Sequence, residues 1–98
     1  MTANIPNSVR KAVYRRDNFR CALCDSTDGL QVHHAIPRGR GGSSRPENLI
    51  TLCWRCHGFI HSGIQAVPDT TPEEAAQACV EYLADLYTTD KHVWSPFK

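Results

Sequence analysis

The chain has 98 residues, of which 41% are hydrophobic, so it can form one compact domain with a modest core. No segment approaches the roughly 18 consecutive apolar residues of a membrane span, and residues 1–6 lack the layout of a signal peptide. Composition therefore argues against membrane-spanning and secreted classes and predicts a cytoplasmic protein.

The formal net charge of +1 conceals an asymmetry along the chain. Residues 1–62 carry nine lysines and arginines against four acids, whereas residues 63–98 carry two against six. A polyanion would therefore be attracted to the basic first part of the chain and repelled by the acidic second part. An ordinary solvated surface is the alternative, and charge alone does not decide between them.

The first predicted element is a short basic amphipathic helix at residues 8–17. Val9, Ala12 and Val13 recur on one side, and the Pro6-Asn7-Ser8 entry has residues that can cap a helix. The other positions carry four basic side chains: Arg10, Lys11, Arg15 and Arg16.

The middle of the chain predicts a hairpin followed by a helix. Residues 30–34 alternate weakly and predict a strand, and residues 49–52 predict a second strand antiparallel to it. Between them, residues 37–48 hold three glycines, two prolines and three arginines, which predicts a loop. Residues 55–62 predict a short helix, and residues 63–70 predict a linker.

A C-terminal packing helix is predicted at residues 71–88. Thr71 is the expected cap and Glu74 completes a capping box, with a proline between them at the first helical position. In the tail, Trp94 and Phe97 are candidates to pack back on the core. The apolar face of this helix consists of seven residues: Ala75, Ala76, Cys79, Val80, Leu83, Leu86 and Tyr87.

Four of the five cysteines form two Cys-x-x-Cys pairs separated by 28 residues: Cys21 and Cys24, then Cys53 and Cys56. In a cytosolic protein this density favours metal ligation over disulfides. The two-residue spacer lets one turn offer both sulfurs to one ion at about 2.3 Å, so the four thiolates predict a structural zinc site. Buried free thiols or a disulfide are the alternatives. The fifth cysteine, Cys79, is predicted to be a small core residue.

The second constellation consists of four histidines: His33, His34, His57 and His61. His57 and His61 share one face of the predicted helix because they are four residues apart. A classical zinc finger made from the first cysteine pair and these two histidines would need 32 residues between its pairs, against the usual roughly 12. It would also leave the second cysteine pair unused. We therefore expect four cysteines on one ion and imidazoles on a second, open site for a catalytic divalent ion.

Taken together, four stretches of this sequence resemble the HNH endonuclease family: residues 32–38 with the paired histidines, the Gly41-Gly42 loop, residues 47–53, and residues 56–61. The resemblance covers about residues 8–62 and is closest to small phage and bacterial members with a four-cysteine zinc knuckle. It implies an α+β fold, in which residues 21–62 form the knuckle and a ββα-metal (His-Me finger) core. The flanking helices would complete one nuclease domain over residues 1–98.

The resemblance also implies roles for individual residues. His34, Asn48 and His57 match the three residues that name the motif. His34 would be the general base, Asn48 would hold the loop that bears it, although in some branches it reaches the metal, and His57 would bind the catalytic ion. His33, where many relatives have aspartate, would be another ligand, and His61 matches a position that some relatives use. The ion could be Mg²⁺, Mn²⁺, Ni²⁺ or Zn²⁺.

The implied activity is metal-dependent hydrolysis of DNA phosphodiester bonds with one metal ion, leaving 5′-phosphate and 3′-hydroxyl ends. Such chemistry needs an activated water and a cation near the leaving oxygen, and a neutral His34 can accept the proton of that water. Arginines of the loop would grip phosphates beside the cut, and basic residues of the N-terminal helix would extend that surface, although solvation alone explains at least half of them. The loop residues are Arg38, Arg40 and Arg45, and the helix residues are Arg10, Lys11, Arg15 and Arg16.

The implied partners are DNA and larger phage or bacterial proteins, in the cytoplasm of a bacterial host or phage-infected cell. The competing hypothesis is a non-catalytic zinc-binding module that binds DNA or a protein and has vestigial histidines. The small size of the chain motivates that alternative.

Overall fold

We describe the fold from a computed structural model in which residues 5–63 and 69–97 are described. Residues 64–68 of the predicted linker lie outside this part. None of the helices in the described ranges is long and apolar enough to cross a membrane. The elements are α1 (Asn7–Arg16), β1 (Gln31–His34), two 3-10 turns named η1 (Arg38–Arg40) and η2 (Pro46–Asn48), β2 (Leu49–Leu52), α2 (Trp54–Ser62) and α3 (Pro72–Tyr87).

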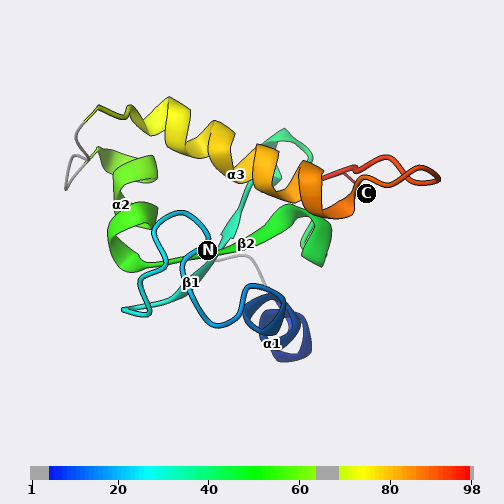
Figure 1. The fold of residues 1–98 in the computed structure, drawn as a ribbon, viewed down its shortest axis with the longest axis horizontal. Coiled ribbons are helices and arrows are strands. Elements are labelled where there is room, and N and C mark those ends of the chain that lie inside the picture. The colour runs from blue at the N-terminus through cyan, green and yellow to red at the C-terminus, as the bar shows by residue number, and fades with distance from the viewer. Residues whose placement is uncertain (1–4, 64–68, 98) are drawn as a thin grey trace.

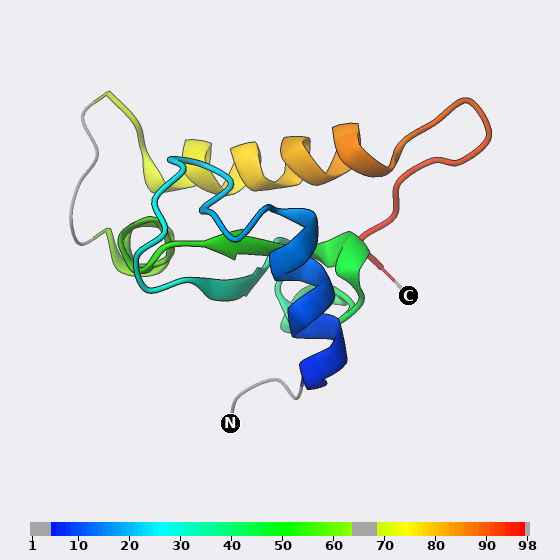
Figure 2. The same cartoon turned by 60° about the horizontal axis from the view of Figure 1, so that its bottom comes forward.

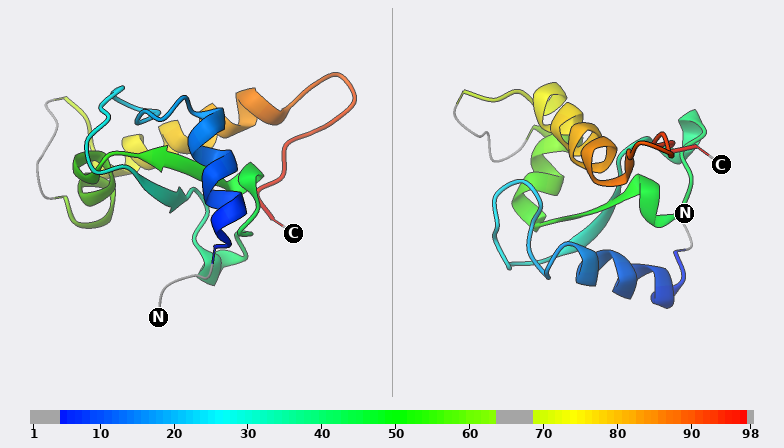
Figure 3. Two further views of the ribbon diagram at one scale, coloured as in Figure 1. Left: turned by 90° about the horizontal axis from the view of Figure 1, so that it is seen from below. Right: turned by 45° about the vertical axis from the view of Figure 1, so that its right-hand side comes forward.

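Strands β1 and β2 form the predicted antiparallel pair, with Gln31 opposite Leu52 and His34 opposite Leu49. This small sheet lies between α1 on one side and α3 on the other (Figures 1 and 3). All four residues of β2 are buried because helices cover the strand from both sides. Helix α2 follows β2 directly and packs against both strands and α3, as Figure 2 shows from another direction.

The capping box of α3 is confirmed. The Thr71 hydroxyl accepts a hydrogen bond from the Glu74 amide at 3.1 Å, and the Glu74 carboxylate accepts one from the Thr71 amide at 2.9 Å. Cys79 is fully buried in the core cluster, as predicted, beside Leu83. The end of the predicted apolar face is wrong, since Leu86 is 45% exposed where α3 runs beyond the sheet.

Helix α1 differs from the prediction in two ways. Pro6 occupies its N-cap position, and no side chain caps the helix. Of the predicted apolar side, Val13 is fully buried but Ala12 is exposed. The helix is instead anchored at its other end, by Arg16 and Asp17.

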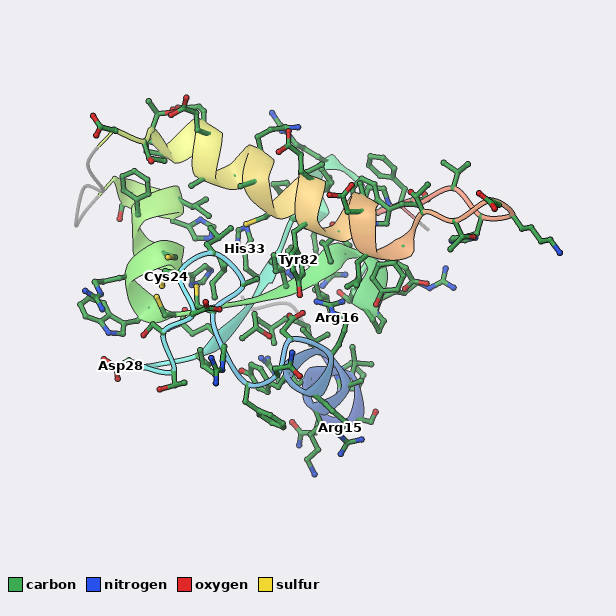
Figure 4. All side chains as sticks on the ribbon, in the orientation of Figure 1. Arg15, Arg16, Cys24, Asp28, His33 and Tyr82 are labelled. Atoms are coloured by element: carbon green, nitrogen blue, oxygen red, sulfur yellow. The ribbon has the colours of Figure 1, made fainter. Side chains whose placement is uncertain are left out.

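Asp17 and Arg16 form a hydrogen-bonded anchor between α1, β2 and α3. The Asp17 carboxylate accepts two bonds from the Arg16 guanidinium at 2.9 Å, one from the Tyr82 hydroxyl at 2.6 Å and one from the Thr51 amide at 3.0 Å. Arg16 also donates to the carbonyls of Pro46 and Leu49 and to the Tyr87 hydroxyl. Figure 4 shows Arg16 and Tyr82 pointing toward each other across this junction.

The C-terminal tail returns to the loop that follows β1. The Trp94 indole donates to the Glu47 carbonyl at 2.6 Å, and the Ser43 amide donates to the Pro96 carbonyl at 2.9 Å. Phe97 pairs with Gly42 in an isolated bridge. The prediction that Trp94 and Phe97 pack back is therefore confirmed, although Phe97 stays 46% exposed.

Candidate metal centre and active site

The four paired cysteines meet at one place. Their sulfur atoms all lie within 4.8 Å of one another, and the Cys24 and Cys53 sulfurs are 3.6 Å apart. Sulfurs at about 2.3 Å from a tetrahedral zinc ion are about 3.8 Å apart, so the observed spacing fits such an ion. Cys21 and Cys24 lie in a turn before β1, whereas Cys53 is the N-cap of α2 and Cys56 lies in its first turn.

One thiol of the cluster ionises more readily than a free cysteine, whereas burial raises the pKa of Cys24 and Cys56. Burial works against the thiolate of Cys53, but hydrogen bonds from Cys56 and Cys24 outweigh it and lower the pKa of Cys53 to about 7. A thiolate is the form of cysteine that binds metals. The first cysteine pair is tied to the sheet, because the Ala22 amide donates to the Thr51 carbonyl at 2.9 Å. The cysteine cluster thus fixes where α2 begins relative to β2.

Three histidines form a second cluster beside the first. His33 comes from β1, and His57 and His61 come from successive turns of α2. Their ligand atoms lie within 4.8 Å of one another, and the Nε2 atoms of His57 and His61 are 3.1 Å apart. Burial, followed by the nearby His57 and His61, lowers the pKa of His33 to about 3. Its imidazole is therefore neutral near pH 7, as a metal ligand must be.

His57 has a hydrogen-bond partner that was not predicted from the sequence. Its Nδ1 atom makes a hydrogen bond with the Gln31 side-chain oxygen. Such a partner orients a ligand ring and leaves the other nitrogen, Nε2, to face His61. The alternation of side chains along a strand could have indicated this partner, because it places Gln31 on the same side of β1 as His33.

His34 lies next to this cluster but points at different partners. Its Nε2 atom is 3.1 Å from the Ser44 hydroxyl. Burial, then the charges of Arg38 and Arg10, lower the pKa of His34. The ring is therefore neutral near pH 7 and able to accept a proton.

Asn48 is fully buried behind the loop that follows His34. Its side-chain oxygen accepts from the Ile36 amide at 2.8 Å, and its amide group donates to the carbonyls of Ile36 at 2.9 Å and Ser43 at 2.8 Å. Gly42 is required at the point of closest approach, because a Cβ atom there would lie 1.9 Å from the Ile36 carbonyl oxygen and 2.7 Å from Asn48. Asn48 therefore closes the loop between Ile36 and Ser43.

A cavity of about 1100 Å³ collects the four histidines and part of the basic surface. Arg10 from α1 and Arg38 and Arg40 from η1 line it together with the histidines. Of the other predicted phosphate contacts, Arg45 lines a separate, smaller hollow with the tail, and Arg15 points outward from α1 (Figure 4).

Arg16 has no donor left for a phosphate. A guanidinium has five N–H groups, and Arg16 uses all five within the protein. We correct its predicted role on this ground, because its position inside the fold makes it an anchor of α1.

These features define a class of protein: a small α+β domain with a zinc-knuckle arrangement of cysteines and a ββα-metal core. A family model of HNH endonucleases matches residues 21–63, the segment that holds both clusters and Asn48. Residues 21–63 therefore form a domain of the HNH endonuclease family.

Two curated proteins are similar in sequence. Anaredoxin of Nostoc sp. (strain PCC 7120) is 36% identical over 67 residues, which cover 64% of this chain and 88% of that protein. The Type IV methyl-directed restriction enzyme EcoKMcrA of Escherichia coli (strain K12) is 41% identical over 39 residues, which cover 40% of this chain and 14% of the enzyme. The second likeness is confined to a small part of a much longer protein.

Proposed function

We propose that this protein is a metal-dependent endonuclease that hydrolyses phosphodiester bonds of DNA. The observation that carries the proposal is the joint placement of three converging histidines, a fourth neutral histidine and three arginines in one cavity. Family membership supports nuclease activity as the class of chemistry, and the substrate and the residue roles are our proposal.

His33, His57 and His61 would hold the catalytic ion. Three imidazoles with further positions open to water or substrate are typical of catalytic sites, and imidazole favours Zn²⁺ and Ni²⁺ over Mg²⁺. When bound, a divalent ion stabilises negative charge on the scissile phosphate and the leaving 3′ oxygen. The four cysteines would hold a separate structural zinc ion, because their set is closed and consists of thiolates alone.

The remaining roles fall to side chains that do not bind metal. His34 would accept the proton of the attacking water, since its imidazole is neutral and lines the cavity. Asn48 would hold the loop after His34, a role supported by its three hydrogen bonds to loop backbone. Arg10, Arg38 and Arg40 would bind phosphates on either side of the cut.

The test is a nicking assay on supercoiled plasmid DNA with the purified full chain. The protein is treated with a mild chelator and then assayed without metal and with Mg²⁺, Mn²⁺, Ni²⁺ or Zn²⁺. We expect nicking that depends on added metal, is lost in His34→Ala and remains in Asp85→Asn, which changes an exposed residue of α3. DNA binding without metal-dependent nicking would instead favour the non-catalytic zinc module.

A further inference from the structure

One side chain touches the proposed base without having a role in the function described so far. The Ser44 hydroxyl lies 3.1 Å from Nε2 of His34. Both residues are half-buried, and Ser44 lies in the loop between η1 and η2. Ser44 is ten residues from His34 and lies in an irregular loop, so no helix or strand periodicity indicates this contact.

The contact matters because a neutral imidazole has one nitrogen with a proton and one without. Which nitrogen carries the proton is set by the hydrogen bond that the ring makes. A general base must present the bare nitrogen to the water whose proton it takes. Nε2 of His34 faces the Ser44 hydroxyl, which can donate or accept a hydrogen bond; when it accepts, the bare nitrogen left to meet a water is Nδ1.

We propose that Ser44 is the positioning residue of His34: its hydroxyl oxygen accepts a hydrogen bond from Nε2–H and thereby keeps Nδ1 unprotonated and turned into the cavity. This inference rests on the proposed function, because it gives the reason why His34 has the tautomer a base requires. Without Ser44, the imidazole is free to rotate about its two-fold χ2 torsion and to exchange its two nitrogens. Only a fraction of molecules would then present the correct nitrogen.

Ser44 can hold the ring because its neighbour Ser43 is itself fixed from two sides. The buried Ser43 accepts a hydrogen bond from Asn48 on its carbonyl at 2.8 Å and donates its amide to the Pro96 carbonyl at 2.9 Å. The Ser43 hydroxyl also accepts from the Arg45 amide at 3.3 Å. The backbone on both sides of Ser44 is therefore tied to the interior and to the tail.

The tautomer can be measured without any substrate. Long-range ¹H–¹⁵N correlation spectra of the zinc-loaded full chain distinguish a protonated from an unprotonated ring nitrogen, and the spectrum of His34→Gln identifies the signals of His34. The same samples are then assayed for steady-state nicking, which gives kcat and KM separately. The variants are Ser44→Ala, Ser44→Thr, which keeps a hydroxyl, and Ser8→Ala, which changes an exposed serine of α1.

We expect His34 of the wild type to be protonated at Nε2 alone. Ser44→Ala should give mixed tautomers and lower kcat about tenfold with little change in KM, as for other residues that orient a histidine. Ser44→Thr should restore both measurements, and Ser8→Ala should change neither. A wild-type His34 protonated at Nδ1, or an unchanged tautomer in Ser44→Ala, overturns the proposal. If the wild type cuts no DNA, the proposed function fails, and the spectra still decide whether Ser44 fixes the ring.

Discussion

Replacing Asp17 with asparagine tests whether the anchor of α1 stabilises the fold. The Asp17 side chain is fully buried, and its four hydrogen bonds come from the Arg16 guanidinium, the Tyr82 hydroxyl and the Thr51 amide. Each carboxylate oxygen accepts two of these bonds. The asparagine side chain would keep the shape, but its NH₂ group would face two donors and the charge opposite Arg16 would be lost.

The expected loss in the free energy of unfolding is about 3 kcal/mol. Removing one partner of a buried ion pair costs about 3–5 kcal/mol, and the lower end applies because Arg16 keeps three other acceptors. Such a loss is a large fraction of the roughly 5–15 kcal/mol of a typical domain. Urea unfolding of the zinc-loaded protein, followed by tryptophan fluorescence, measures it, with the exposed Asp85→Asn of α3 as the matched control.

The pH dependence supplies a second check on the same residue. Burial opposes ionisation of Asp17, but the hydrogen bonds from Arg16 and Tyr82 outweigh it and hold the pKa of this carboxyl below its ordinary value. A lowered pKa in the folded state contributes stability that is present above the unfolded pKa of about 3.9 and is lost as pH falls through the folded pKa. The difference between wild type and Asp17→Asn should therefore be constant from about pH 6 to 7 and shrink below about pH 4. A difference under about 1 kcal/mol at pH 7, the size of an exposed ion pair, would refute the reasoning.

Three further predictions concern the site. Cys21→Ser should abolish binding of the proposed structural zinc and unfold or strongly destabilise the chain, measured by elemental analysis and circular dichroism; a folded, reduced, zinc-free wild-type protein would refute the cysteine site. Gly42→Ala should cost about 1–3 kcal/mol because the new methyl group overlaps the Ile36 carbonyl, whereas Gly39→Ala, with open space around it, should cost less than half as much in thermal unfolding. His61→Ala should weaken binding of the proposed catalytic metal about 10-fold or more in calorimetric titration, yet retain the proposed structural zinc; unchanged affinity would exclude His61 as a ligand.

Much of the local structure was predictable because short sequence signals are sufficient to define it. The Thr71 capping box begins α3 where expected, and the paired Cys-x-x-Cys spacing brings four sulfurs together. The spacing of His57 and His61 likewise places both rings on one face of α2. The capping residues and the two histidines each lie within about one helical turn, and the two cysteine pairs are of the kind that bind one ion together.

The interactions that sequence reasoning missed depend on how the elements dock. Arg16 follows three other basic residues of α1, so its sequence context resembles a solvated surface, and only the docking of β2 and α3 supplies its acceptors. Ser44 reaches His34 because Asn48 and the tail fold the loop back over β1. Such contacts join residues 10 to 71 positions apart, and no local pattern encodes them.

The site has two separate supports, which explains how so short a sheet can hold it. A two-stranded sheet with four residues in each strand is marginal by itself. The cysteine cluster fixes the start of α2 and hence His57 and His61, whereas Asn48 and the tail fix the loop after His34. Loss of the proposed structural metal should therefore first disturb the proposed ligands of the catalytic ion, whereas loosening of the tail should first disturb the proposed base. The two supports also share one core, since Cys21 and Cys53 belong to it and Trp94 packs against it. Damage to one support should therefore leave the contacts of the other in place only while that core stays intact.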